Sequence, residues 1–393
     1  MTQQRSMRIA IIGGGIGGLT AALALRQFGF EPKVFEQAPV LLEVGAAIIM
    51  WPNAMRVLYR LGLAESVRQH AGVVEQTQWL RQDGRLLNQV CLPKSDAPAL
   101  VLRRADLQKV LLSALPQNSI HLGRVFESYR QMPDRIVANF GDGSPVDCDV
   151  LIGADGLHSN VRAQLLNDGP PIDRGYSAWR GVVAHTPASL TSATGYEIYG
   201  RGQRFGIGPL GAGKTGWWAS ANTARGVSIG SAGLANRDEL VRRFAGWWEP
   251  VVELIQATPL TALVRNEVFD RLPSRQWGEG SMTLLGDAIH PTTPNLGQGG
   301  CLAIEDAAVL ARCLHQHAAN AGIPFALREY EKLRFARSSA IARYSRIYGA
   351  IGQWENRLAV WMRNLVLSSF PESMSEKLFR QVFDYDAYAL VSS

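Results

Sequence analysis

The sequence predicts an α/β fold: a parallel sheet assembled from separated segments of the chain, an inserted antiparallel sheet, and a helical C-terminus. Near the N-terminus, an apolar run over Met7–Ile12 leads through a glycine-rich turn into a helical pattern and a second strand. Two later apolar runs, in 148–156 and 282–286, also end in loops that contain glycine. Between these runs, residues 176–225 alternate in polarity and are rich in aromatic side chains and glycine, which is typical of antiparallel strands. From Ala303 onward the pattern is mostly helical.

The N-terminal glycine turn has the spacing of a dinucleotide-binding loop. Gly13 allows the tight turn after the strand, Gly15 lets backbone N–H groups approach a pyrophosphate, and Gly18 lets helix and strand pack closely. The N-terminus of the following helix adds partial positive charge beside the phosphates. Glu36 ends the next strand, Lys33–Phe35, and can accept a hydrogen bond from a ribose hydroxyl. An acid there disfavours a 2′-phosphate, so the turn predicts FAD or NAD rather than NADP.

The segments that follow are interpreted from their periodicity and their turn residues. Residues 44–53 resemble a loop that leads into a helix from about Asn53. Residues 74–103 alternate in polarity around Asp83-Gly84, which predicts a hairpin. A helical stretch follows at 104–111.

Further along, residues 119–152 predict short strands, and residues 236–256 predict a helix. Gly208–Thr215 matches the phosphate-loop pattern GxxxxGK[ST]. That pattern requires a helix after it, whereas the residues from Gly216 to Ser220 are strand-like, so a hairpin turn is expected instead.

Composition limits the class of protein. The chain has 393 residues, which suggests about two folding units, and it is 47% hydrophobic and 19% charged, as globular proteins are. The net charge of +6 fits anionic ligands such as phosphates, but no Lys/Arg-rich block is present, so no nucleic-acid partner is expected. The four cysteines are far apart without a CxxC pair, so neither a disulfide framework nor a metal site is expected.

The apolar segments are too short to cross a membrane, and the N-terminal one is interrupted by glycines, so we expect a soluble, cytoplasmic protein. The amphipathic segment Arg357–Leu367 has three possible roles: packing on the α/β domain, a dimer contact, or contact with a membrane that holds a lipophilic substrate. Packing is expected, because most apolar helix stripes face a core. The oligomeric state stays open between monomer and homodimer.

Two further loops follow buried strands and are expected to meet the glycine turn. Residues 153–162 contain Gly153-Ala-Asp155-Gly156, and residues 286–300 contain four glycines, two prolines and Asp287 before a helix begins. Ligands of parallel sheets gather beyond the carboxyl ends of the strands. So many glycines and prolines are costly in a simple connection, which favours a binding role for the second loop.

Together these three motifs resemble those of the class A, single-component FAD monooxygenases, a family that includes salicylate hydroxylases, urate hydroxylases and zeaxanthin epoxidases. They are Gly13–Gly18 with Glu36, Gly153–Gly156 with Arg162, and Gly286-Asp287 through Gly300, and the resemblance covers nearly all of 7–345. It implies a Rossmann-like FAD-binding domain built from separated segments, with a substrate domain inserted between them. The expected boundaries are 1–73, 104–175 and 270–345 for the FAD domain, 74–103 and 176–269 for the substrate domain, and 346–393 for a helical C-terminal segment.

The resemblance also implies which residues bind FAD. Gly13, Gly15 and Gly18 would hold the pyrophosphate, Glu36 the ribose, and Arg104 the phosphate side of the flavin. Val125 would meet the adenine through its backbone, and Asp155 and Gly156 would serve both FAD and the visiting NAD(P)H. The full cofactor set expected is Gly13, Gly15, Ile16, Gly18, Glu36, Gln37, Ala47, Arg104, Val125, Asp155, Gly156, Asp287, Gly297, Gly299 and Gly300.

The chemistry that the resemblance implies uses FAD, NAD(P)H and O₂, and a flavin C4a-hydroperoxide delivers oxygen to an electron-rich aromatic or heteroaromatic ring. Catalytic candidates are His290 as a general base, Pro294 as a shaping residue of the oxygenation pocket, and Arg204 facing an anionic group. For His290 the alternative is a hydrogen bond within its own loop. No second nucleotide-binding turn is present, so NADH and NADPH both stay possible.

The substrate is expected to be a small aromatic molecule bound by the inserted sheet. Aromatic side chains there can line a pocket or fill a core, and the second role is the commoner one for any single residue. The candidates are Tyr176, Trp179, Tyr199, Arg204, Trp217, Trp218 and Pro294. The alternatives are an epoxidase that acts on a lipophilic alkene or a quinolone-like ring, and a flavin-bound interaction protein without turnover.

Overall fold

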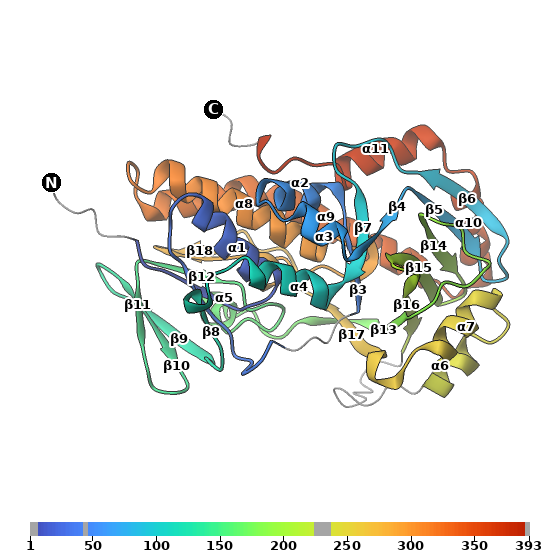
Figure 1. The fold of residues 1–393 in the computed structure, drawn as a ribbon, viewed down its shortest axis with the longest axis horizontal. Helices are drawn as coiled ribbons and strands as arrows, with labels where there is room; N and C mark the ends of the chain where they lie inside the picture. The colour runs from blue at the N-terminus through green and yellow to red at the C-terminus, as the bar shows by residue number, and fades with distance from the viewer. Residues whose placement is uncertain (1–6, 42–45, 224–236, 390–393) are drawn as a thin grey trace.

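A six-stranded sheet assembled from separated segments lies in one half of the molecule, at the left in Figure 1. The structure is a computed structural model and describes residues 7–41, 46–223 and 237–389, so parts of the segments predicted at 44–53, 176–225, 236–256 and 346–393 lie outside it. Every neighbouring pair of strands in this sheet is parallel except β18–β19. In spatial order the strands are β18 (Gly278–Glu279), β19 (Met282–Leu284), β12 (Val150–Gly153), β1 (Ile9–Ile12), β2 (Lys33–Phe35) and β8 (Ile120–His121).

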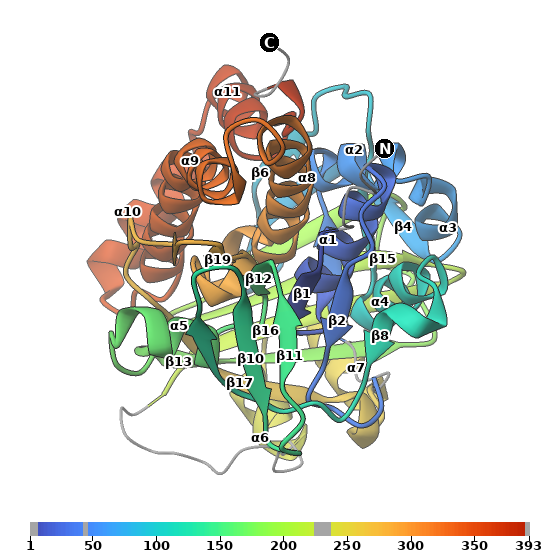
Figure 2. The same ribbon diagram turned by 90° about the vertical axis from the view of Figure 1, so that its left-hand side faces the viewer.

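Helices cover one side of this sheet, and a small antiparallel sheet lies on the other (Figure 2). The apolar, alanine-rich helix α1 (Ile16–Gln27) packs against α8 (Gly299–His317), and α8 packs against α9 (Ile323–Gly352). The small sheet consists of β9 (Phe126–Gln131), β10 (Ile136–Phe140) and β11 (Val146–Cys148), as the short strands predicted at 119–152 require. The fold class predicted from the sequence is confirmed. The shorter helices are α2 (Pro52–Arg60), α3 (Ala64–Arg68), α4 (Arg104–Ser113) and α5 (Asn160–Leu166).

A seven-stranded sheet makes up the second half of the molecule. Its pairings are antiparallel except for β14–β5, which is parallel. The hairpin predicted at Asp83-Gly84 is present as β5–β6 and joins this sheet. In spatial order the strands are β17 (Val264–Asp270), β13 (Ile172–Val183), β16 (Lys214–Asn222), β15 (Gln203–Gly211), β14 (Thr194–Tyr199), β5 (Gln76–Arg81) and β6 (Leu86–Cys91).

A core separate from that of the six-stranded sheet lies behind the seven-stranded sheet. It contains Phe205, Trp217 and Phe244, and helices α6 (Arg237–Arg243) and α7 (Glu249–Ala257) supply residues to it. The single helix predicted at 236–256 is therefore two helices. The break contains Gly246 at φ +76°, a conformation that interrupts a right-handed helix.

Two turn regions test the sequence interpretation. The expectation of a loop at 44–53 is wrong, because Ala47–Met50 forms strand β3, whose Ile48 and Ile49 pair with β7 (Ala99–Arg103). β7 also pairs with β4 (Ala71–Val74), so an apolar run of four residues is stabilised by a partner distant in sequence. The phosphate-loop match at 208–215 is the β15–β16 hairpin, as expected.

The C-terminal helix α10 (Arg357–Ser368) is turned outward. Leu358, Trp361, Met362, Leu365 and Val366 share one face and are 50–64% exposed, whereas Arg363 points inward. Arg363 donates hydrogen bonds to the carbonyl oxygens of Gly352 at 3.1 Å and Gly200 at 2.9 Å. The expectation that this stripe packs on the α/β domain is wrong. A last helix, α11 (Glu372–Val382), follows, and within the described residues no helix has the length and apolarity needed to cross a membrane.

Candidate active site

A cavity of about 920 Å³ lies where the loops of the six-stranded sheet meet one face of the seven-stranded sheet. This volume is near the upper end of the range that small-molecule sites span. The three loops that follow β1, β12 and β19 all reach it, through Gly15–Gly17, Gly156 and Asp287. The structure therefore brings together the three motifs that the sequence placed far apart.

The glycine turn presents bare backbone to this cavity. Gly13 has φ +109°, and a Cβ there would lie 2.4 Å from the carbonyl oxygen of Ala154. A Cβ on Gly18 would lie 2.0 Å from the carbonyl oxygen of Gly13, so helix and turn touch. A Cβ on Gly15 would meet nothing within 4 Å, and α1 has neither a capping side chain nor an acid in its first turn. The N-terminus of α1 is thus open to an anionic ligand.

Glu36 lies at the outer side of the same turn. Its Oε2 accepts a hydrogen bond from the Gly14 N–H at 2.6 Å, and its Oε1 accepts one from the Ala38 N–H at 2.9 Å. Gln37 is exposed next to it, and Val125 is 47% exposed across from it. These three residues do not line the cavity but form a surface beside the glycine turn.

Two arginines face the cavity from opposite sides. Arg104 is the first residue of α4, and Arg180 comes from the middle of β13. Burial and the charge of Arg104 lower the pKa of Arg180, whose Nη1 donates to the Asn266 Oδ1 at 3.2 Å. Sequence reasoning missed Arg180, although a cation within the apolar segment 178–183 was a usable signal. Two guanidinium groups that line one cavity favour the binding of an anion there.

The loop at 286–300 places Asp287, Pro294, Gly297, Gly299 and Gly300 on the cavity. The Asp287 carboxyl is accessible from the cavity but enclosed by protein, and this burial raises its pKa, which the charges of His290 and Arg104 oppose. α8 begins at Gly299 without a capping side chain or a first-turn acid, so a second helix N-terminus faces the same space.

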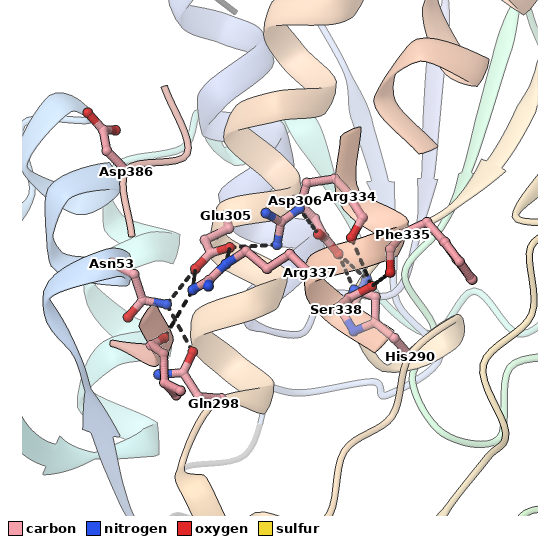
Figure 3. A network of polar contacts seen from close by, with 12 residues as sticks. Asn53, His290, Gln298, Glu305, Asp306, Arg334, Phe335, Arg337, Ser338 and Asp386 are labelled. Carbon is pink, nitrogen blue, oxygen red and sulfur yellow. Dashed lines mark hydrogen bonds and ion pairs between the residues drawn. The ribbon is translucent and has the colours of Figure 1, made fainter. Parts of the chain in front are cut away.

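A buried ionic network fixes this loop to the helices behind it (Figure 3). His290 Nε2 lies 2.5 Å from the Asp306 Oδ2, which also accepts the Gly286 N–H at 3.0 Å. The Asp306 Oδ1 accepts a hydrogen bond from the Arg334 Nε at 2.7 Å. Burial alone would raise the pKa of Asp306, but the charges of His290 and Arg334 outweigh it and lower that pKa to about 2.

The same network continues to the other end of the loop. The Glu305 carboxylate forms ion pairs with the guanidinium groups of Arg334 and Arg337, each with an N···O distance of 2.7 Å. Asn53 donates to Glu305 at 2.5 Å and to the Oε1 of Gln298 at 2.9 Å, so α2, α8 and α9 hold the residue that precedes Gly299 (Figure 3).

This geometry fixes the place of His290. The ring does not line the large cavity, and it borders a separate small pocket with Trp277 and Ser338. Its Nε2 contacts Asp306 and so ties the loop to α8, and the general-base role considered from the sequence stays a prediction. Asp155 is also turned into its own loop, where it accepts hydrogen bonds from Ser159 at 2.6 Å and from the Val161 N–H at 3.2 Å.

A polar cluster on the seven-stranded sheet and α9 adjoins the loop at 286–300. Glu197 and Tyr348 line the cavity, and Glu197 accepts hydrogen bonds from Arg204 at 2.8 Å and from the Tyr348 hydroxyl at 2.9 Å. Tyr199 contacts the Tyr348 hydroxyl, and Arg204 also contacts Asn295, which follows Pro294. Burial raises the pKa of Glu197, an effect that the charge of Arg204 opposes. Arg204 itself is fully buried behind this carboxylate.

The candidate aromatic residues divide between the two faces of the sheet. Tyr176, Tyr199 and Trp218 line the cavity. Trp179 does not: it is 1% exposed and lies beside the guanidinium groups of Arg243 and Arg265.

Trp217 borders the cavity, but its indole N–H donates to the Thr258 Oγ1 at 2.8 Å and its ring stacks on Phe205 in the core. Because side chains alternate along a strand, Trp217 and Trp218 cannot both face the substrate. The residues that the structure describes contain no cluster of His, Cys, Asp or Glu side chains suited to a metal ion.

Comparison with known sequences shows which family shares this arrangement. The profile of the FAD binding domain family matches residues 6–345. The chain belongs to this family. A relative named aurachin C monooxygenase/isomerase, from Stigmatella aurantiaca, is 41% identical over 92% of this chain and 94% of its own. The 3-amino-4-hydroxybenzoate 2-monooxygenase of Streptomyces cremeus is 35% identical over 87% of this chain and 86% of its own.

Solved structures agree with this assignment. The Klebsiella pneumoniae protein HpxO, in complex with FAD and uric acid, superposes with a TM-score of 0.88 at 30% identity, over 97% of each chain. The resemblance to class A FAD monooxygenases that the sequence suggested is confirmed. As a member of the FAD binding domain family, the protein offers suitable groups for this cofactor: two uncapped helix N-termini, the open space at Gly15 and the paired cations Arg104 and Arg180.

Proposed function

We propose that the protein is an oxygenase that uses FAD, NAD(P)H and O₂ to insert one oxygen atom into an electron-rich heteroaromatic ring. The observation that carries this proposal is the cavity itself. Part of its lining consists of backbone and glycine loops suited to a flavin, and the seven-stranded sheet and α9 add the side chains of Glu197 and Tyr348. A flat ring between the loops and these side chains would have its polar edge at Glu197. The relatives named above, which are monooxygenases by name, support the same reaction class.

The cofactor would lie along the path that the three loops form. We assign the pyrophosphate to Gly13, Ile16 and the N-terminus of α1, and the adenosine side to Glu36, Gln37 and Val125. Towards the flavin, Ala47, Arg104, Gly156, Asp287 and the turn 297–300 would follow. When bound, the flavin supplies the electron transfer and the oxygen activation that the protein's side chains cannot perform.

The chain's own residues then act on the substrate. Glu197 would accept the proton of a ring hydroxyl or N–H, because an electron-rich ring reacts best when it is ionised. Arg204 and Tyr348 hold this carboxylate in place, and Arg204 supplies the counter-charge that a buried carboxylate requires. Pro294 and the aromatic side chains Tyr176 and Trp218 would confine the ring and exclude water.

Oxygen-uptake measurements test this function. Purified yellow protein is mixed with NADH or NADPH and with phenols, quinolones, purines or polyenes. We expect at least one ring compound to accelerate both NAD(P)H oxidation and O₂ uptake, and to gain one oxygen atom by mass spectrometry. If bound flavin is never reduced under any of these conditions, the protein is a flavin-bound interaction protein rather than an oxygenase.

Epoxidation of a ring double bond is a second candidate with a specific observation behind it. The cavity is apolar beyond Glu197, where Val90 and Leu92 line it. A lipophilic heteroaromatic ring would fit this polarity. Product analysis separates the two reactions, because epoxidation yields an epoxide or its rearranged or hydrated derivative, whereas hydroxylation yields a phenol.

A further inference from the structure

The cavity continues past its polar cluster along one face of the seven-stranded sheet. Residues paired in register share a face, and Glu197 on β14 is paired with Trp79 on β5. One strand further, Thr77 on β5 is paired with Val90 on β6, and both line the cavity. Two strand spacings amount to roughly 10 Å. The lining therefore changes from carboxylate and tyrosine to apolar side chains over about that distance.

The C-terminal helices close this extension from the opposite side. Asn88 on β6 donates hydrogen bonds to the carbonyl oxygens of Leu367 and Phe370, each at 3.1 Å, and so ties the end of α10 to the sheet edge. The Phe370 ring lies 5.9 Å from that of Trp79. This apolar compartment is lined by Trp79, Val90, Leu92, Met362, Val366, Leu367, Phe370, Leu378 and Phe379.

Charge is nearly absent from this part of the cavity. Among the described residues of β5, β6, α10 and α11 that line the cavity, Arg363 is the one charged side chain. It donates hydrogen bonds to the carbonyl oxygens of Gly352 and Gly200. A polar ligand group would find little to bind there, whereas a hydrocarbon would lose no hydrogen bond. The compartment is also open at α10, since Met362 is 50% exposed and Val366 is 61% exposed while both line the cavity.

We propose that this apolar compartment binds a long hydrocarbon tail attached to the ring, so that the substrate is a heteroaromatic ring with a lipophilic chain. The inference rests on the proposed function for the position of the ring, with its polar edge at Glu197. Two residues of the outward stripe of α10, Met362 and Val366, would then form the apolar rim through which the tail enters or extends.

A homologous series of ligands tests the compartment. The FAD-loaded protein is titrated with 4-quinolones that carry methyl, pentyl or nonyl tails, and the dissociation constant is read from the change in flavin absorbance. Each buried methylene should tighten binding roughly fourfold. We expect the nonyl compound to bind more than about 100-fold tighter than the methyl compound, and to have a lower KM with a similar kcat. Equal affinity for all three tails overturns the proposal.

Two neighbouring positions on α10 provide matched variants. Val366 lines the cavity, whereas Leu365 is 52% exposed and does not. Val366→Asp should weaken binding of the nonyl compound about tenfold and leave the methyl compound unchanged, while Leu365→Asp changes neither. Identical effects of the two variants overturn the proposal. If long tails bind more tightly but do not stimulate NAD(P)H oxidation, the result supports the compartment and contradicts the proposed reaction. Failure of the tail-binding proposal and failure of the proposed function can therefore be told apart.

Discussion

At the scale of single residues, the ion pair between Glu197 and Arg204 places a carboxylate of the cavity lining beside a buried positive charge. Arg204 is fully buried and contacts the cavity-lining residues Glu197 and Asn295, so we propose that it positions these groups instead of facing the substrate directly. Tyr348 adds a hydroxyl to the same carboxylate from α9. Neither Glu197 nor Tyr348 belongs to any of the three loop motifs, and only the fold brings them together.

Replacing Glu197 by glutamine should therefore lower kcat/KM for a ring substrate by about 100- to 10,000-fold, the typical contribution of a positioned general base. Because the pKa of Glu197 is raised, its ionised form is lost as the pH falls through a value above that of an ordinary glutamate. Wild-type activity should decline on that acid limb, and Glu197→Gln should lack the limb. Glu253→Gln, on the far side of the sheet, is the control. An unchanged pH profile in Glu197→Gln would remove Glu197 from the mechanism.

His290 provides the complementary test. If it anchors the loop through Asp306, then His290→Asn should reduce FAD affinity and stability, because the loop at 286–300 loses a buried contact. The acid limb of the pH profile should stay where it is, since that limb belongs to Glu197. Dialysis against FAD-free buffer measures the first effect, and a pH series of kcat/KM measures the second. Loss of the acid limb in this variant would support His290 as the base.

At the scale of elements, α8 and α9 act as the support of the active-site loop. Asp306 and Glu305 lie side by side on α8, and Arg334 and Arg337 on α9 pair with them, so four buried charges join the two helices (Figure 3). From the loop, the Gly286 N–H and the His290 ring add hydrogen bonds to the Asp306 carboxylate. Buried charges of this kind are stable only when every partner is present.

Asp306→Asn should accordingly lower the free energy of unfolding by about 3 kcal/mol, because Arg334 loses one of its two carboxylate partners and His290 loses its carboxylate contact in a buried site. The depressed pKa of Asp306, about 2, means that its contribution is present above the ordinary carboxyl pKa and is lost only as the pH falls towards 2. Urea unfolding at neutral and acidic pH measures this. Asp238→Asn on α6, remote from the network, is the control. Equal stability of wild type and Asp306→Asn would show that the network is dispensable.

At the scale of the whole molecule, the cavity depends on chain segments that are far apart in the sequence. The three loops come from residues near 15, 155 and 290, and further lining comes from the seven-stranded sheet and the C-terminal helices. A ligand that touches all of them links these segments. Bound FAD should therefore stabilise the protein as a unit rather than one loop of it.

Removal of FAD should lower the melting temperature. A ligand present at 100 times its Kd adds about 2.7 kcal/mol to the free energy of unfolding, which is several degrees for a chain of this size. Calorimetry of the yellow protein and of the same protein after FAD extraction measures the difference, and re-addition of FAD should reverse it. An unchanged melting temperature would show that the cofactor does not bridge the segments.

Local signals proved sufficient where the sequence neighbours are also the structural neighbours. The strand Lys33–Phe35 and the hairpin at Asp83-Gly84 are present as predicted, and so is the hairpin in place of a phosphate loop at 208–215. Each depends on turn residues and periodicity within a short window. Strand β3 at Ala47–Met50 was missed because its stability comes from pairing with β7, about fifty residues away.

The sequence by itself determined the family, the fold class and the loops that line the cavity, because glycine turns at strand ends depend on local backbone geometry. Only the tertiary structure decided which side chains face the cavity. It placed Trp179 in a core and His290 beside a separate small pocket, and it brought Arg180, Glu197 and Tyr348 to the large cavity. It also showed that α10 presents its apolar stripe outward. These outcomes depend on strand register and on contacts distant along the chain, which residue types and spacing do not encode.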